Sequence, residues 1–224
     1  MSDTIWKRSS VVRAPEEGEV SVWRVRLNAA DVSVGHLKSM LSMDELERAE
    51  RFHFQTHHDS YVITRATLRQ ILGACLQMDP RDVQFGYGPQ RKPYLGNWSG
   101  AAHERLHFNV SHSSGLALIA VTRGREVGVD VERIHAVRDL ESLASQFFSR
   151  FEFQQLMSLP YERRLASFCA CWTRKEAYLK ATGRGLSYPM RRVEVTLAPG
   201  DQPRIVAVDG SAAFFQRRAE RIES

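Results

Sequence analysis

The sequence contains little that would stabilise a secreted or membrane-bound protein. Only three of its 224 residues are cysteines, an odd number, and Cys169 and Cys171 are separated by a single residue. This usage argues against a disulfide framework and indicates reduced thiols in a cytoplasmic protein. No segment approaches the roughly 18 consecutive apolar residues of a membrane helix, and the N-terminal residues hold no apolar run of signal-peptide length. We therefore expect a cytoplasmic protein without a membrane-spanning segment.

Internal repeats, low-complexity tracts and charge blocks are also absent. Hydrophobic residues make up 43% of the chain and charged residues 25%, which is ordinary for a globular protein large enough to bury its own core. The formal net charge is +5. A basic surface predicts an anionic partner, and three kinds remain open at this point: a nucleic acid, a phosphorylated ligand or an acidic protein.

Local patterns predict helices and strands joined by short connections, and therefore an α+β fold. A polar helix is expected at 43–57, and a second helix from Asp59, a candidate N-cap, to the Asp79-Pro80 step. Residues 81–104 are typical of a loop with short strands. Three strands are then expected, at 106–110, 116–121 and 127–131.

The second half of the chain is expected to be mainly helical. Ser149 and Glu152 form an S-x-x-E capping box for one helix. Pro160 can begin a longer helix that Gly183 ends. The other elements expected here are one or two helices from about Asp139, strands at 192–197 and 205–208, and a charged helix or tail at 214–224.

Two carboxylates stand two residues apart in the motif Gly128-x-Asp130-x-Glu132. On a strand, Asp130 and Glu132 share one face with their Cα atoms roughly 6.5 to 7 Å apart. That spacing lets both carboxylates approach one Mg²⁺, which binds a few carboxylates together with water and substrate phosphates. Taken alone, the motif is better explained as a half-exposed strand with solvated acids, because such short patterns recur by chance.

A second motif lies on the long predicted helix, where Trp172, Glu176 and Lys180 are four residues apart and share a face. A carboxylate beside Lys175 and Lys180 could hold a metal-phosphate complex. Taken alone, the spacing is better explained as an ordinary ion pair between Glu176 and Lys180, because such pairs are common and contribute only about 0.3 to 0.5 kcal/mol.

Two further patterns could bind phosphate. Ser111 and His112 follow a predicted strand and offer hydroxyl, imidazole and backbone donors. A hydrolase triad is disfavoured, since no G-x-S-x-G elbow surrounds Ser111 and an adjacent Ser and His cannot easily act as nucleophile and base. The segment Arg91-Lys92-Pro93 holds two cations in a stiff loop, which suits a phosphate clamp and also a solvated turn.

In this order, a basic loop, N-x-S-H, G-x-D-x-E and W-x-x-K-E-x-x-x-K resemble the signature of the 4′-phosphopantetheinyl transferase superfamily, in its larger, Sfp-type branch. The resemblance covers about residues 43 to 197 and includes the distance from Glu132 to Glu176. It implies a monomer of two pseudo-twofold-related α/β halves, 1–120 and 121–224, with coenzyme A in the cleft between them. It also implies transfer of 4′-phosphopantetheine from coenzyme A to a serine of an apo carrier protein, with release of 3′,5′-ADP.

The resemblance carries roles to individual residues. Asp130, Glu132 and Glu176 would ligate Mg²⁺, with Mn²⁺ also acceptable. Glu176 matches the position that helps to deprotonate the attacking serine, and Lys180 would stabilise the leaving 3′,5′-ADP, so that Glu176, Lys180 and Asp130 form the catalytic set. The residues expected to bind coenzyme A are Arg48, Arg91, Lys92, Pro93, Asn109, Ser111, His112, Asp130, Lys175, Glu176 and Lys180.

The partner implied by the resemblance is an acidic acyl, peptidyl or aryl carrier protein of fatty acid, polyketide or nonribosomal peptide biosynthesis. Glu45 stands where many relatives carry a basic residue near the 3′-phosphate, so that contact is either missing or supplied by Arg48 or Arg51. Two alternatives remain: a basic nucleic-acid-binding module and a magnesium-dependent phosphodiesterase. The scattered basic residues, without a helix-turn-helix, zinc or RRM pattern, argue against nucleic acid, and we expect neither a nucleic-acid nor a membrane partner.

Overall fold

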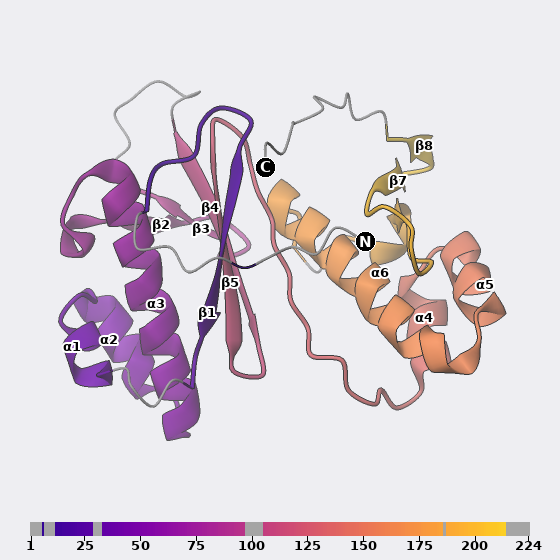
Figure 1. Cartoon of the computed structure of the whole chain (residues 1–224), viewed down its shortest axis with the longest axis horizontal. Helices are drawn as coiled ribbons and strands as arrows, with labels where there is room; N and C mark the ends of the chain where they lie inside the picture. The colour runs from indigo at the N-terminus through magenta and orange to yellow at the C-terminus, as the bar shows by residue number, and fades with distance from the viewer. Residues whose placement is uncertain (1–5, 7–11, 29–32, 97–104, 186, 214–224) are drawn as a thin grey trace. The chain divides into compact units, whose positions relative to one another are not determined.

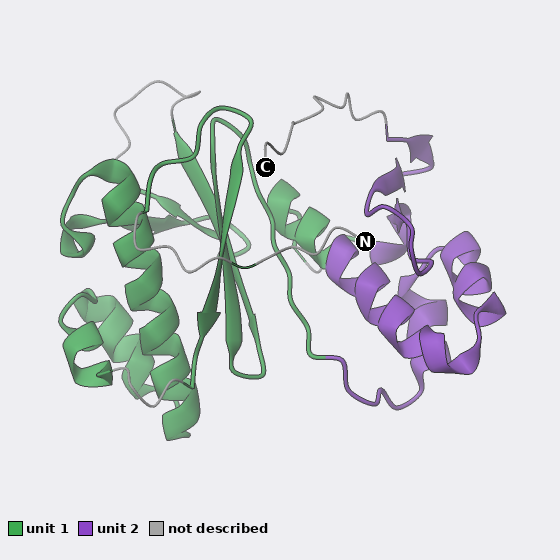
Figure 2. Ribbon diagram, viewed as in Figure 1, with its two compact units in different colours: residues 1–133, 176–188 green, residues 134–175, 189–224 purple. Residues whose placement is uncertain are grey.

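The computed structural model describes residues 6, 12–28, 33–96, 105–185 and 187–213. Figure 2 shows two compact units, the first formed by residues 1–133 and 176–188 and the second by residues 134–175 and 189–224. Helices and antiparallel sheets occur in both, which confirms the predicted α+β class. The first unit extends along the chain to residue 133, and the division into halves 1–120 and 121–224 stays a prediction. The pseudo-twofold relation between the halves stays a prediction.

The first unit combines a three-stranded sheet, a hairpin and helices packed on the sheet (Figure 1). The sheet has the strand order β1-β5-β4 and is antiparallel throughout, while β2 pairs with β3. The elements are β1 (Val20–Arg26), α1 (Val34–Lys38), α2 (Met43–Glu50), α3 (Gln55–Leu76), β2 (Phe85–Tyr87), β3 (Pro93–Leu95), β4 (Leu106–Ser113) and β5 (Leu116–Arg123). The strands predicted at 106–110 and 116–121 are confirmed as β4 and β5.

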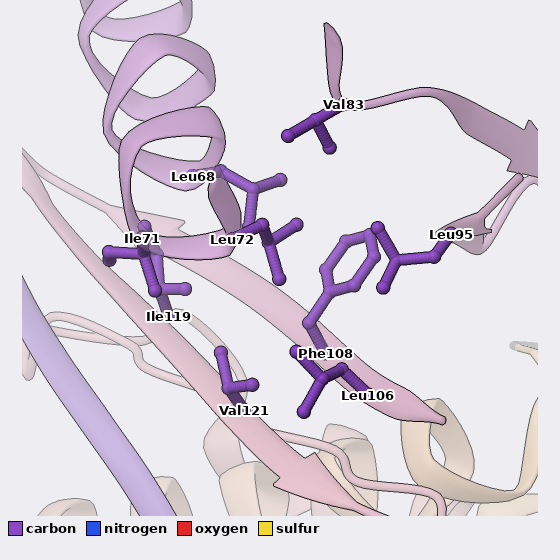
Figure 3. Close-up of a cluster of buried hydrophobic side chains, with 9 residues drawn as sticks. All are labelled: Leu68, Ile71, Leu72, Val83, Leu95, Leu106, Phe108, Ile119 and Val121. Carbon is purple, nitrogen blue, oxygen red and sulfur yellow. The ribbon is translucent and has the colours of Figure 1, made fainter. Parts of the chain in front are cut away.

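One face of this sheet packs against α3 (Figure 3). Leu68 and Leu72 of α3 belong to the same buried cluster as Phe108 of β4 and Val121 of β5, which are cross-strand neighbours. Side chains alternate between the two faces along a strand. The odd-numbered residues of β4 therefore point away from α3, and this second face carries the polar groups discussed below.

The helix predicted at 43–57 is instead two helices. α2 ends at Glu50, and α3 begins at Gln55 with the extended residue Phe54 as its N-cap. Asp59 therefore lies inside α3, and the prediction that it caps the helix is wrong. The break has a physical reason: Ala49 of α2 and Val62 of α3 lie in one buried cluster, which one straight helix could not fold back to form.

The second unit is built around the N-terminal part of α6. Its elements are α4 (Leu140–Phe147), α5 (Arg150–Ser158), α6 (Tyr161–Thr182, of which 161–175 belong to this unit), β6 (Val193–Val195), β7 (Ile205–Val208) and β8 (Ser211–Ala212). The predicted long helix and the strands within 192–197 and at 205–208 are confirmed. The predicted charged helix or tail at 214–224 lies outside the described residues. No helix in the described ranges is long and apolar enough to span a bilayer.

A buried ion pair anchors α6 in this unit. The Lys175 ammonium lies 2.6 Å from Glu152 Oε2, and both side chains are fully buried. Lys175 also donates to the carbonyl oxygens of Met190 and Val193, while Glu152 accepts the backbone N–H of Ser149 and so completes the predicted capping box. Every charge is therefore matched by several hydrogen bonds, the condition under which a buried pair is tolerated.

Replacing Lys175 with methionine is expected to lower the free energy of unfolding by about 3–5 kcal/mol, since the Glu152 carboxylate would stay buried without its counter-charge. Urea denaturation measures the loss. The matched control is Lys38→Met, which removes a lysine from the solvent-exposed pair with Glu50 and should change stability little. Equal effects of the two substitutions would contradict the structural role of Lys175.

Candidate active site

The segment 127–133 comes after β5 in the sequence and lies alongside β4. It does not join the sheet, so the strand predicted at 127–131 is wrong. Polar side chains at alternate positions of β4 accept hydrogen bonds from alternate backbone amides of the segment. The three bonds run from Val129 N–H to Asn109 Oδ1 (2.9 Å), from Val131 N–H to Ser111 Oγ (3.4 Å) and from Arg133 N–H to Ser113 Oγ (3.2 Å). Side chains of β4 lie between the two backbones, so the segment makes these hydrogen bonds without forming a backbone ladder with β4.

The same serines bond to the two carboxylates of the G-x-D-x-E motif. Ser111 donates its hydroxyl to Asp130 Oδ1 (2.8 Å), and Ser113 donates to Glu132 Oε2 (2.9 Å). Lys180, on the last turns of α6, donates to Asp130 Oδ1 (2.5 Å) and to Ser111 Oγ (3.0 Å). The Asp130 side chain is only 5% exposed. The structure thus brings Ser111, Asp130 and Lys180 into one hydrogen-bonded cluster.

The glycine of the motif sets the distance to α6. A Cβ atom at Gly128 would overlap with the carbonyl oxygen of Ala177 and the amide nitrogen of Ala181, both in the backbone of the helix. Only glycine allows the segment to pass this close. The close approach brings Asp130 within reach of Lys180, four residues after Glu176.

Glu176 lies in the electrostatic field of the same cluster. Burial, followed by the negative charge of Asp130, raises the pKa of the Glu176 carboxyl above its usual value, while Lys180 opposes the shift and Glu132 adds to it. Among the described residues, Glu176 Oε1 and Asp130 Oδ2 are buried oxygens without a hydrogen-bond partner. Unsatisfied buried acceptors are costly, and a pair of them beside each other's negative charge is typical of a cation site.

The donor set fits Mg²⁺ in its chemistry. Carboxylate oxygens are the ligands that this cation prefers, and it normally keeps water and substrate phosphate in the rest of its shell. Within the part of the chain that the structure describes, no group of three or more acidic, histidine or cysteine side chains is placed to hold a metal ion. Joint ligation of one cation by Asp130, Glu132 and Glu176 therefore stays a prediction.

Lys92 does not stand free as a phosphate clamp. Its ammonium donates to Glu126 Oε2 (2.6 Å) and to the carbonyl oxygens of Val127 (3.4 Å) and Ala181 (3.2 Å). His107 Nδ1 also lies 3.0 Å from Glu126. Lys92 therefore connects the loop before β3 to both the 127–133 segment and the end of α6.

A cavity of about 300 Å³ lies beside Lys92. Its wall includes the ring of Tyr94, over which the Arg105 guanidinium lies 5.4 Å from the centroid. The other lining residues that matter here are Gln90, Pro93, His107 and Glu126. An aromatic face, cations and a carboxylate in one cavity can hold a polar aromatic ligand.

Other predicted residues lie apart from the cluster. His112 is exposed and, as an even-numbered residue of β4, points to the opposite face from Ser111. Arg48 is exposed on α2 with its guanidinium over the Tyr61 ring, and Arg91 is exposed in the loop before β3 with a left-handed φ of 57°. The prediction that Lys175 binds coenzyme A is corrected by the structure. Its ammonium is buried and bonded to Glu152 and to two backbone carbonyl oxygens, which leaves no N–H for a phosphate.

Glu45 also has a structural rather than a ligand-facing position. It is 1% exposed and bonds to the guanidinium groups of Arg65 and Arg69. Burial alone would raise the pKa of Glu45, but the hydrogen bond and charge of the two arginines hold it below its usual value. The acid at this position therefore neutralises arginines inside the first unit.

Ser113 and Glu126 are site residues that the motif analysis did not single out. Ser113 had a detectable signal, since Asn109, Ser111 and Ser113 are polar residues at a strand's spacing of two. Glu126 had none, because its bonds to Lys92 and His107 join parts of the chain far apart in sequence.

Comparison with known sequences assigns the family. A family model described as the 4′-phosphopantetheinyl transferase superfamily matches residues 126–222, and one described as 4′-phosphopantetheinyl transferase, N-terminal, matches residues 28–124. The chain is 42% identical over 187 residues to the 4′-phosphopantetheinyl transferase HetI of Nostoc sp., covering 84% of this chain and 78% of that protein. It is 31% identical to the 4′-phosphopantetheinyl transferase psf-1 of Bacillus pumilus, over 80% of this chain and 73% of the relative.

A third relative, the 4′-phosphopantetheinyl transferase Sfp of Bacillus subtilis, is 26% identical over 81% of this chain and 78% of its own length. The chain belongs to the 4′-phosphopantetheinyl transferase superfamily, in its Sfp-type branch. The phosphodiesterase and nucleic-acid alternatives find no support in these comparisons.

Gly128→Ala is expected to abolish activity and to lower the melting temperature, because the new methyl group would meet backbone atoms of α6 that cannot rotate away. Thermal denaturation and a transfer assay measure both effects. Gly35→Ala is the matched control: it sits in α1 with no atom within 4 Å of its added Cβ and should be neutral or slightly stabilising. Wild-type behaviour of Gly128→Ala would refute the close approach.

Proposed function

We propose that the cluster of Ser111, Asp130, Glu176 and Lys180 is where this transferase moves the 4′-phosphopantetheine arm of coenzyme A onto a serine of an apo carrier protein. The observation that carries the proposal is the pair of buried carboxylate oxygens without a hydrogen-bond partner among the described residues, on Asp130 and Glu176, beside the ammonium of Lys180. In phosphoryl transfer the protein contributes mainly by positioning the reactants and neutralising their charge. Carboxylates that can hold a cation, next to an ammonium group, suit both tasks.

In the proposed reaction the carrier serine attacks the phosphorus nearest the pantetheine arm, in line with departing 3′,5′-ADP, and no covalent enzyme intermediate forms. Glu176 accepts the proton of the serine hydroxyl, directly or through water. Lys180 uses two of its three N–H donors on Asp130 and Ser111 among the described residues, which leaves a third for the leaving phosphate.

Asp130, Glu132 and Glu176 would together hold Mg²⁺. When bound, the cation supplies charge neutralisation at the pyrophosphate of coenzyme A. Asp130 is held for this task by Ser111 and Lys180, and Glu132 by Ser113. Mn²⁺ would fit the same oxygen donors.

The cavity beside Lys92 is the proposed position of the nucleotide of coenzyme A. Tyr94 offers a face on which a base can stack, while Glu126 can accept a hydrogen bond from an exocyclic amine. Arg105 and His107 add cationic or donor groups for phosphate. In this arrangement Lys92 and Pro93 shape the cavity, and the exposed Arg48, Arg91 and His112 would reach the 3′-phosphate from outside it.

The experiment that tests the function is incubation with coenzyme A, Mg²⁺ and a panel of apo acyl, peptidyl and aryl carrier proteins, read by intact mass. At least one carrier should gain the mass of phosphopantetheine, with release of one 3′,5′-ADP for each arm transferred. Consumption of coenzyme A at the same rate without any carrier would contradict the proposal and identify a phosphodiesterase.

Asp130→Asn is expected to abolish transfer nearly completely while leaving the melting temperature close to that of the wild type. The substitution keeps the shape of the side chain but removes the charge that pairs with Lys180 and would bind the metal. EDTA should silence the wild type, and added Mg²⁺ should restore it.

The matched control for this substitution is Asp82→Asn, an exposed residue outside the cluster, which should transfer normally. Transfer by Asp130→Asn at the wild-type rate would remove Asp130 from the metal site.

The proposal extends to the partner. The net charge of +5 favours an acidic carrier, with charge chiefly speeding encounter, and we place the enzyme in the cytoplasm as a monomer. None of the three cysteines, all within the described residues, forms a disulfide, in keeping with a reducing compartment.

The apparent KM for an acidic carrier is therefore expected to rise as NaCl is raised to physiological strength, where the Debye length shortens to about 8 Å. Steady-state kinetics measure this, with KM for coenzyme A determined separately because that substrate is also anionic. A carrier KM that stays flat over the same range would mean that docking is chiefly apolar.

A further inference from the structure

The polar face of β4 has a regularity that the transfer reaction alone does not require. Asn109, Ser111 and Ser113 each accept a backbone N–H from the segment opposite, at positions 129, 131 and 133. β4 and the segment both advance by two residues from one hydrogen bond to the next. The side chains therefore set a register between β4 and the segment, much as backbone amides do within a sheet.

The two serines of this face perform a second task at the same time. A hydroxyl can accept one hydrogen bond and donate another. Ser113 accepts from Arg133 N–H (3.2 Å) and donates to Glu132 Oε2 (2.9 Å), and Ser111 stands in the same relation to Val131 and Asp130. Each carboxylate is thus tied to the serine that also holds the backbone one residue further on.

The two carboxylates differ in how many groups hold them. Asp130 is bonded by Lys180 as well as by Ser111, and its side chain is 5% exposed. Glu132 is exposed. Within the described part of the chain, the Ser113 hydroxyl is the group that donates a hydrogen bond to its carboxylate. A glutamate has three side-chain torsions, so an exposed one loses considerable rotamer entropy when it is fixed. The orientation of Glu132 therefore depends on Ser113 far more than that of Asp130 depends on Ser111.

We infer that Ser113 is a positioning residue that holds the Glu132 carboxylate ready for a divalent cation, and that the alternate polar residues of β4 serve as a template for the spacing of the two carboxylates. This inference rests on the proposed function, since it takes Asp130 and Glu132 to be metal ligands. Partners of this kind, which orient a ligand without touching the metal, typically change metal affinity 10- to 100-fold when removed.

Three variants test the inference. Ser113→Ala removes both the donor to Glu132 and the acceptor for Arg133 N–H. Ser113→Thr keeps a hydroxyl and suits a strand. Ser39→Ala is the matched control, since it removes a hydroxyl from the same unit whose bond is local, to the carbonyl of His36.

The primary measurement is Mn²⁺ binding to the protein without coenzyme A or carrier, followed by electron paramagnetic resonance of the free ion. Ser113→Ala should weaken Mn²⁺ binding by about 10-fold or more. Ser113→Thr and Ser39→Ala should bind Mn²⁺ as the wild type does. In transfer assays Ser113→Ala should need correspondingly more Mg²⁺ for half-maximal rate, with KM for coenzyme A little changed at saturating Mg²⁺.

The possible results separate this inference from the function it rests on. Mn²⁺ binding by the wild type that Ser113→Ala leaves unchanged overturns the inference and spares the metal site. A loss of affinity that Ser113→Thr fails to restore, together with a matching fall in melting temperature, also overturns it, because the effect is then one of folding. A wild type that binds no Mn²⁺ overturns the metal site of the proposed function and the inference with it.

Discussion

The first unit depends on one constraint, the passage of the 127–133 segment between β4 and the end of α6. Gly128 allows that passage, because any side chain there would overlap with the backbone of the helix. On its other side the segment is held by side chains of β4 rather than by a backbone ladder. A segment fixed from both sides has little freedom to rotate, so Asp130 is committed to the Ser111–Lys180 cluster.

This constraint concentrates negative charge where folding alone would avoid it. Asp130 and Glu176 raise each other's electrostatic cost, and burial adds to it, as the raised pKa of Glu176 indicates. Lys180 compensates for only part of that cost, since it bonds a single oxygen of Asp130. Strain of this kind is found at functional sites, where a ligand supplies the missing positive charge.

The W-x-x-K-E-x-x-x-K motif divides its residues between two jobs. Lys175 and Glu176 are adjacent, and adjacent residues of a helix project roughly 100° apart. Lys175 is buried against Glu152 in the second unit. Glu176 belongs to the first unit, where the negative charge of Asp130 helps to raise its pKa. Trp172 stacks on Phe168 in the aromatic packing of the second unit. The motif is therefore as much a folding signal as a chemical one, which explains why its basic residues cannot all be assigned to phosphate.

Sequence alone determined the fold class, the strands β4 and β5, the capping box of α5 and the bounds of α6, because each of these follows from local periodicity or from capping chemistry. It also singled out Asp130, Glu176 and Lys180, whose types and spacing suit a metal-phosphate site. Only the tertiary structure decided that Lys175 and Glu45 are internal counter-charges, since their burial depends on partners in other elements, at least 20 residues away: Glu152, Arg65 and Arg69. It likewise decided that residues 127–131 are no strand. Their alternating pattern predicts an extended backbone, but their N–H groups at 129 and 131 donate to side chains of β4 rather than to backbone carbonyls of a neighbouring strand.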